Sequence, residues 1–253
     1  MSDYKIIKLM SANNDDYIGH ANLEIISENY RFNDWMYRQI KTRLKEKMGN
    51  ILEVGSGLGT FSEKIIRDME PSSHITLTDV SASYVQALRK RYSSCQNVYV
   101  NIMDLNSREE YSKIGYEKYD SIIALNVLEH IKDDQLALLE LYKMLKKGGM
   151  LVILVPCHKF LFNVIDVNVG HFRRYTKKEL RDKVNQTNFN VEHMRYFNTL
   201  GMVGWYFNGN VFKNAGLNPT ASKWFDRLVP FLDYLDRMTF NKIGLSLICY
   251  LKK

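Results

Sequence analysis

The chain has 253 residues, of which 45% are hydrophobic, so it can bury a sizeable core and a disordered chain is excluded. Its three cysteines, Cys95, Cys157 and Cys249, are widely spaced, which favours neither a zinc site nor a disulfide framework and fits a reducing compartment. The first residues are too polar for a signal peptide, and no apolar run reaches the roughly 18 residues of a membrane helix, so we expect a soluble, cytoplasmic protein.

The net charge of +7 is unevenly distributed along the chain. Residues 1–150 carry 20 basic and 21 acidic side chains, whereas residues 151–253 carry 15 basic and 7 acidic ones. A basic surface favours phosphate-bearing or acidic partners, or an anionic membrane face. A solvated basic surface without a ligand is the alternative.

The first predicted element is a helix within residues 22–40, which carries the aromatic side chains Tyr30, Phe32 and Trp35. These side chains form either a lid over a ligand site or the face by which the helix packs on the core. The sequence leaves both interpretations open.

A glycine-rich loop follows the predicted strand at residues 50–54. The stretch ILEVGSGLGTF, residues 51–61, places three glycines at every second position, Gly55, Gly57 and Gly59. A dinucleotide fingerprint requires its third glycine where this chain has Thr60, and the lysine of a phosphate-binding loop is absent. The loop therefore disfavours a bound diphosphate.

Strand-like and helix-like stretches alternate from residue 50 to residue 156. Such alternation produces βαβ units, and near-continuous apolar strands indicate a sheet covered on both faces. We therefore expect an α/β fold with a doubly wound, mostly parallel sheet whose ligand site lies at the carboxyl ends of the strands. Strands are predicted at 50–54, 74–80, 97–102, 119–125 and 149–156, and helices at 58–69, at 81–92 with Ser81 as N-cap, and at 132–149 with Gly148 as C-cap.

Two carboxylates stand where ligand contacts are expected. Asp79 ends the second predicted strand, where a carboxylate can accept hydrogen bonds from both hydroxyls of a ribose. Asp104 follows the third, where it can accept a proton from an exocyclic amine such as that of adenine. Helix capping or turn formation is the alternative role for each residue.

Taken together, the ordered motifs resemble class I S-adenosylmethionine-dependent methyltransferases. The resemblance rests on LEVGSGLGTFS, LTDVS, IMDL, YDSIIALNVLEHI and LKKGGMLVILVP, which cover roughly residues 50–156. It implies S-adenosylmethionine as cofactor, S-adenosylhomocysteine as product, and a seven-stranded Rossmann-like sheet with a late antiparallel strand. The glycine loop would then hold an adenosyl group with an amino acid tail.

The resemblance also implies the cofactor-binding residues. Gly55 and Gly57 would pass close to the methionine part, and Glu53 would be linked to the cofactor's amino group through the loop or water. The other implied contacts are Asp79 on the ribose, Asp104 with the amide of Leu105 on adenine, and Asn126 near the sulfonium.

After the fifth strand, about twenty irregular residues precede a predicted helix that Thr176 caps, with Glu179 completing a capping box. A loop of this length inside a compact domain is usually functional. The stretch DVNVGHFRRYTKKEL, with RYFNTLGMVGW and GLSLICYLKK, resembles methyltransferases associated with bacterial cell-surface glycan and lipid-linked sugar assembly.

For an acceptor hydroxyl, the enzyme must align the oxygen and remove its proton. We expect His171 to be the general base, oriented by Asp166, and His130 to be a lesser candidate. Arg173, Arg174 and Tyr175 are the predicted substrate-binding residues, the arginines for an acidic group such as phosphate. A hydrogen-bonded loop histidine and arginines paired with protein carboxylates are the alternatives.

The end of the chain, residues 243–252, has strand character, with residues 190–198 as its predicted partner. We therefore expect one domain over residues 1–253. It divides into an N-terminal helical lid (1–49), a cofactor-binding core (50–156), an acceptor-side insertion with helices (157–242) and the final strand (243–253). The apolar stretches 198–216 and 223–238 could form an acceptor wall, a homodimer face or a peripheral membrane contact.

The leading hypothesis is O-methylation of a sugar or phosphate-bearing precursor of a bacterial surface polysaccharide. A small-molecule or lipid acceptor of the quinone or polyisoprenoid type is the main alternative. RNA methylation is less favoured because no RNA-binding module is visible and the basic residues are dispersed, so no nucleic acid partner is expected. A non-catalytic cofactor-binding subunit is the fourth hypothesis, and no metal site is predicted.

Overall fold

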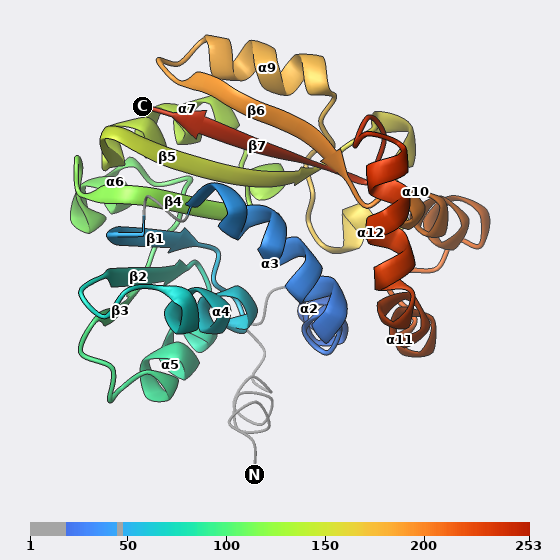
Figure 1. The fold of residues 1–253 in the computed structure, drawn as a ribbon, viewed down its shortest axis with the longest axis horizontal. Coiled ribbons are helices and arrows are strands. Elements are labelled where there is room, and N and C mark those ends of the chain that lie inside the picture. The colour runs from blue at the N-terminus through green and yellow to red at the C-terminus, as the bar shows by residue number, and fades with distance from the viewer. Residues whose placement is uncertain (1–18, 45–47) are drawn as a thin grey trace.

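The computed structural model describes residues 19–44 and 48–253, which form a seven-stranded sheet flanked by helices (Figure 1). The strand order is β3-β2-β1-β4-β5-β7-β6. Strands β1 to β5 are mutually parallel, whereas β7 pairs antiparallel with both β5 and β6. This arrangement confirms the predicted doubly wound α/β fold with a late antiparallel strand. The strands are β1 (Asn50–Val54), β2 (His74–Asp79), β3 (Val98–Ile102), β4 (Tyr119–Leu125), β5 (Leu145–Pro156), β6 (Asn190–Phe197) and β7 (Ser246–Lys252).

The helices lie on both faces of the sheet and beyond one end of it (Figure 1). In chain order the α-helices are α2 (His20–Ser27), α3 (Tyr30–Leu44), α4 (Thr60–Asp68), α5 (Ala82–Arg91), α6 (Arg108–Ile114), α7 (Asp134–Met144), α8 (Val164–Asn168), α9 (Lys177–Asn185), α10 (Thr199–Trp205), α11 (Pro219–Arg227) and α12 (Val229–Met238). Short 3-10 turns η2 (Leu128–His130) and η3 (Lys159–Leu161) follow β4 and β5, and the π-helix η4 (Tyr206–Val211) continues α10.

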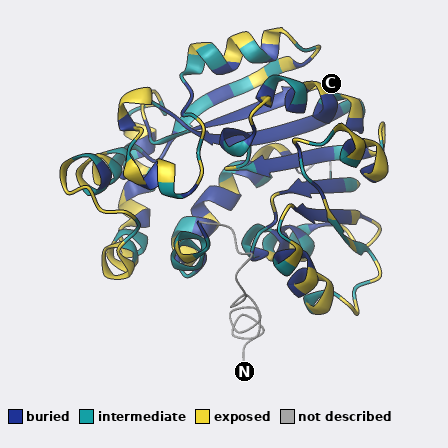
Figure 2. Cartoon of the chain, turned by 180° about the vertical axis from the view of Figure 1, so that it is seen from behind, coloured by how far each residue is buried: buried dark blue, intermediate teal, exposed yellow. Residues whose placement is uncertain are grey.

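Two apolar cores lie on opposite faces of the sheet because side chains alternate along each strand. On β5, Leu151 and Ile153 belong to the core covered by α6, α7 and α9, whereas Val152 and Leu154 belong to the core covered by α3, α4, α5 and α12. Figure 2 accordingly shows the strands mainly buried and the helices partly exposed. The sheet is therefore covered on both faces.

The helix at residues 22–40 is two helices, α2 and α3, and its aromatic side chains differ in burial. Trp35 is buried in the core that α12 covers, and Phe32 packs against the same core. Tyr30 is exposed. Core packing is thus the interpretation that holds for Trp35 and Phe32.

Two predicted details are wrong. The helix predicted at 132–149 ends at Met144, because Leu145 pairs with Tyr119 of β4 and already belongs to β5. Gly148 is therefore part of the β5 segment and not a helix C-cap. The stretch after β5 is also less irregular than expected, since η3 and α8 form within it. The predicted capping box of Thr176 and Glu179 is confirmed at the start of α9.

Across residues 19–44 and 48–253, no helix combines the length and the apolar character that crossing a membrane would require.

Candidate functional site

The glycine loop leaves β1 with three glycines of positive φ, Gly55 at 72°, Gly57 at 49° and Gly59 at 77°. L-residues other than glycine rarely adopt this conformation. At Gly55, a Cβ atom would lie 2.6 Å from Cγ2 of Val127, so a side chain is also excluded by space. The amide of Gly55 donates to the carbonyl oxygen of Thr78 at 2.8 Å, which holds the loop against β2.

Asp79 is the last residue of β2, and its carboxylate bonds to the loop after β1 and to the loop after β2. Its Oδ2 accepts a hydrogen bond from the amide of Gly57 at 2.8 Å, and its Oδ1 accepts one from the amide of Ser81 at 2.9 Å. Burial raises the pKa of Asp79, while these amide donors oppose the shift. The carboxylate thus lies directly beside the glycine loop.

Asp104, Leu105 and Asn126 lie at the same sheet edge because they follow β3 and β4, which run parallel to β1 and β2. Asp104 is partly exposed and accepts hydrogen bonds from the amide and the side chain of Asn106, so it forms a turn. Asn126 is exposed, has φ of 53°, and donates its amide to Leu154 of β5. Leu105 is buried. The cofactor contacts assigned to these three residues stay predictions.

Glu53 lies beneath the glycine loop with its carboxylate buried. The hydroxyls of Ser62 and Ser56 donate to Oε2, the latter at 3.1 Å. Burial raises the pKa of Glu53 to about 7, although both serine hydrogen bonds lower it. The predicted link of Glu53 to the cofactor through the loop or water stays a prediction.

In the loop after β5, Asp166 forms hydrogen bonds with several residues of the same loop. It belongs to the capping box of α8, accepting a hydrogen bond from the amide of Asn163 at 3.0 Å. Oδ1 lies 2.7 Å from Nδ1 of His171, and Nε of Arg174 donates to both oxygens at 2.9 and 3.0 Å. Burial raises the pKa of Asp166, but the hydrogen bonds from His171 and Arg174 outweigh it and leave the pKa below its ordinary value. Asp166 is thus an ionised acceptor.

An ionised Asp166 determines which nitrogen of His171 carries the proton. Because the carboxylate only accepts, Nδ1 of His171 donates, and in the neutral imidazole the lone pair is then on Nε2. The His171 side chain is 10% exposed, and its Nε2 lies 3.8 Å from Oε1 of Glu129. This geometry agrees with the predicted orientation of His171 by Asp166, and the role as general base stays a prediction.

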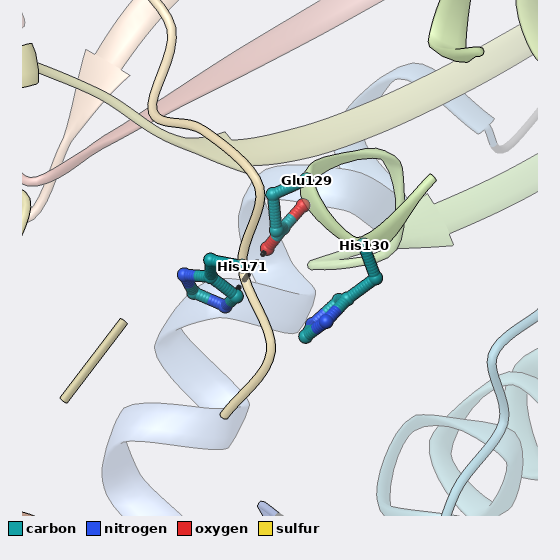
Figure 3. A group of neighbouring side chains, drawn as sticks. All are labelled: Glu129, His130 and His171. Carbon is teal, nitrogen blue, oxygen red and sulfur yellow. Dashed lines mark ion pairs between the residues drawn. The ribbon is translucent and has the colours of Figure 1, made fainter. Parts of the chain in front are cut away.

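Glu129, His130 and His171 converge on one point beside the end of β4 (Figure 3). One ligand-type atom from each side chain lies within 4.8 Å of the others. The Glu129 side chain has no exposed surface, and neither of its carboxylate oxygens has a hydrogen-bond partner. Burial raises the pKa of Glu129 to about 7. The sequence gives no local signal for this cluster because His171 is about forty positions away from the other two residues.

Two predicted substrate-binding residues have side chains buried inside the protein. The Arg174 side chain is 1% exposed, pairs with Asp166 and stacks over the ring of Trp205, so its guanidinium is used inside the protein. Tyr175 is buried, and its hydroxyl donates to Asp134 Oδ2 at 2.8 Å. Neither side chain is available to a substrate. Arg173 is 28% exposed and also pairs with Asp134, at 2.9 Å, so it is the one predicted residue that still reaches the surface.

An apolar groove lies next to this network. It has a volume of about 250 Å³ and is lined by Phe160, Leu161, Met202, Val203 and Tyr206. Trp205 connects the groove to the cluster, because its Nε1 donates to the carbonyl oxygen of Leu161 at 3.2 Å while Arg174 covers its ring. An apolar part of an acceptor would fit there.

Comparison with known proteins agrees with this geometry. A family described as a methyltransferase domain matches residues 52–151. Malonyl-[acyl-carrier protein] O-methyltransferase 1 of Ilyobacter polytropus is 27% identical over 152 residues, which are 58% of this chain and 54% of that protein. Lovastatin diketide synthase of Aspergillus terreus is 31% identical over 113 residues, which are 43% of this chain and 4% of that protein. The chain thus spans about half the length of the first relative and a small part of the second.

Solved structures show the same fold. An S-adenosylmethionine dependent methyltransferase from Mesorhizobium loti has a TM-score of 0.58 and 14% identity, covering 82% of this chain and 93% of that one. The trans-methyltransferase CalH in complex with S-adenosylhomocysteine has a TM-score of 0.57 and 16% identity, covering 90% of this chain and 59% of that one. At these identities the likeness concerns the fold alone.

Proposed function

We propose that the chain is an S-adenosylmethionine-dependent enzyme that transfers the cofactor's methyl group to an oxygen atom of a small acceptor, which the match of residues 52–151 to a methyltransferase domain supports. The cofactor supplies an activated methyl group on a sulfonium. The chain's own residues then have to bind the cofactor, align the acceptor and take up the acceptor's proton.

The observation that carries this proposal is the position of His171 beside the turn that follows β4. The amide of Phe172 donates to the carbonyl oxygen of Glu129 at 2.8 Å, so the loop that bears His171 is bound to the turn after β4. The rings of His171 and His130 are 4.6 Å apart. A proton acceptor therefore lies beside the edge at which Asn126 is expected to meet the sulfonium.

In the proposed reaction the acceptor oxygen attacks the methyl carbon in line with its bond to sulfur. The new oxygen–carbon bond forms as the carbon–sulfur bond breaks, and S-adenosylhomocysteine is released. The acceptor's proton passes to Nε2 of His171, which has a lone pair because Nδ1 is bound to Asp166.

We propose an acceptor with an apolar part, seated in the groove of Phe160, Leu161, Met202, Val203 and Tyr206. This class includes the lipid or polyisoprenoid acceptors that the sequence left open. Two relatives are named a malonyl-[acyl-carrier protein] O-methyltransferase and a lovastatin diketide synthase. Their names extend the proposed class of acceptors to acyl chains.

A sugar or phosphate-bearing acceptor is the second candidate, as in precursors of a surface polysaccharide. The basic excess of residues 151–253 favours it, and Arg173, which is partly exposed, is two positions from His171. The burial of the Arg174 side chain is evidence against this second candidate. A lipid-linked sugar would satisfy both observations.

The first experiment is a calorimetric titration of the full chain with S-adenosylhomocysteine, with Asp79→Ala as the variant. We expect saturable binding by the parent and at least tenfold weaker binding by Asp79→Ala, because the predicted ribose acceptor is lost. Asp182→Ala, a change at an exposed side chain of α9, is the control and should bind like the parent. A folded parent that binds no cofactor would refute the assignment.

The acceptor is then sought by transfer of a radioactive methyl group from S-adenosylmethionine. Acyl-carrier thioesters, polyprenyl phosphates and phosphorylated sugars form the panel. Preference for the first two classes, lost in Met202→Asp but not in Val211→Asp outside the groove, supports the apolar acceptor. Equal transfer to soluble sugar phosphates by both variants would favour the second candidate instead.

A further inference from the structure

The cluster of Glu129, His130 and His171 contains a buried acid that accepts no hydrogen bond, and Nε2 of His171 lies 3.8 Å from its Oε1. Both carboxylate oxygens of Glu129 lack a hydrogen bond, although the side chain has no exposed surface. A buried polar group without a partner is costly, and a bound ion is one of the common reasons for finding such a group. The carboxylate points toward the two imidazoles (Figure 3).

In both histidines Nδ1 lies within hydrogen-bond distance of an oxygen acceptor. Nδ1 of His171 donates to Asp166, and Nδ1 of His130 lies 3.3 Å from the carbonyl oxygen of Gly170, which can only accept. In the neutral form, a ring whose Nδ1 donates to these oxygens carries its lone pair on Nε2. A carboxylate or carbonyl behind the far nitrogen is the usual way in which proteins orient a metal-binding histidine.

We propose that Glu129, His130 and His171 bind a divalent transition-metal ion such as Zn²⁺, Co²⁺ or Mn²⁺ beside the methyl-transfer site. Two imidazoles and one carboxylate are a ligand set for such ions, whereas Mg²⁺ and Ca²⁺ prefer oxygen ligands alone. Three protein ligands leave coordination positions open. The ligand atoms, now within 4.8 Å, would approach one another to roughly 3.4 Å in a tetrahedral site.

The chemical role that we assign to the ion rests on the proposed methyl transfer. An acceptor oxygen bound at an open position would lose its proton more easily because the ion stabilises the resulting anion. In the ion-bound protein Nε2 of His171 would be a ligand, so the acceptor's proton would leave to solvent, and His171 would act as the base only in the metal-free protein. The ion would also hold the oxygen in place for in-line attack on the methyl carbon.

The test is direct metal binding by the full chain after treatment with a chelator. We titrate Co²⁺ and follow its ligand-field absorption and the heat of binding, with Mg²⁺ as the contrasting ion. We expect one Co²⁺ per chain, an increase in melting temperature on binding, and at least a hundredfold weaker response to Mg²⁺.

Three variants locate the site. Glu129→Gln keeps the shape of the side chain, and His130→Gln changes a second ligand, so each should weaken Co²⁺ binding at least tenfold. His74→Gln replaces an exposed histidine at the start of β2, and it should bind Co²⁺ like the parent. Circular dichroism and melting without metal show whether each variant is folded.

The possible outcomes separate this inference from the proposed function. A parent that binds S-adenosylhomocysteine but no Co²⁺, or a folded Glu129→Gln that binds Co²⁺ as the parent does, overturns the metal site and leaves the methyltransferase proposal intact. Metal binding that maps to Glu129 and His130 in a protein that binds no S-adenosylhomocysteine supports the site and refutes its role in methyl transfer.

Discussion

Glu53 shows how one buried side chain can make stability depend on pH. Its carboxylate lies under the glycine loop and accepts hydrogen bonds from Ser56 and Ser62. Its pKa rises from an ordinary 4.5 to about 7 because burial disfavours the charged form. The folded protein therefore binds this proton more tightly than the unfolded chain does.

The contribution of Glu53 to stability is consequently present below pH 4.5 and is lost as the pH rises through 7. We expect the parent to lose about 3 kcal/mol relative to Glu53→Gln between pH 4.5 and pH 8. Urea unfolding of both proteins at several pH values measures this difference. Glu63→Gln, which changes an exposed acid, serves as control, and an equal pH response of parent and Glu53→Gln would contradict the prediction.

Replacement of Gly55 should be costly, because its φ is 72° and a Cβ would lie 2.6 Å from Cγ2 of Val127. We expect Gly55→Ala to lower the free energy of unfolding by at least about 1 kcal/mol and to weaken binding of S-adenosylhomocysteine. Gly204→Ala in α10 is the matched control, since a Cβ there meets open space and alanine is the better helix former. Urea unfolding compares the two, and a Gly55→Ala protein as stable as Gly204→Ala would refute the argument.

At the scale of elements, the capping box of α9 is a local device that the sequence already indicates. Thr176 accepts a hydrogen bond from the amide of Glu179 at 3.1 Å, and Glu179 accepts one from the amide of Thr176 at 3.1 Å. We expect Thr176→Ala to cost about 1 kcal/mol of unfolding free energy. Ser107→Ala should cost less in the same thermal or urea unfolding experiment, because Ser107 is the N-cap of α6 but makes no side-chain capping bond. Equal losses for the two variants would show that the box contributes nothing.

The boundary of a helix can be predicted where residues close in sequence determine it. The prediction is wrong where pairing between strands determines the boundary. Thr176 and Glu179 are neighbours in sequence, so their capping box follows from spacing alone. The end of α7 does not, because Leu145 leaves the helix to pair with Tyr119 across the sheet. Helix propensity over three residues is worth too little to oppose strand pairing.

Across the whole molecule, α12 connects the C-terminal helices to the N-terminal helix and the sheet. Val229 and Leu232 belong to the same core as Trp35 and Ile248. The indole Nε1 of Trp35 also donates to Asp233 of α12 at 2.7 Å. Segments nearly two hundred residues apart therefore share one core, as the predicted single domain requires.

We expect calorimetry to show one cooperative unfolding transition, and Leu232→Ala to lower the stability of that whole transition by about 2–5 kcal/mol. Phe231→Ala, on the adjacent exposed position of α12, should change stability by less than about 0.5 kcal/mol. Two separate transitions, with Leu232→Ala affecting only one of them, would show that residues 157–242 unfold independently.

The candidate site was only partly predictable, for reasons that particular residues make clear. The sequence placed Asp79 and Asn126 at one edge of a parallel sheet because strand ends can be read from local patterns. It also named His171 and Asp166 together, five positions apart. It could not show that Arg174 would turn inward to pair with Asp166, since burial depends on how the whole loop packs.

The α/β elements, the glycine loop and the residues at the strand ends can be read from the sequence, because periodicity, glycine positions and capping residues are local properties. Only the tertiary structure decided that His171 meets Glu129 and His130. That meeting depends on the loop after β5 lying against the turn after β4, which the amide of Phe172 and the carbonyl oxygen of Glu129 hold together. Contacts between distant segments are created by packing, and spacing along the chain does not encode them.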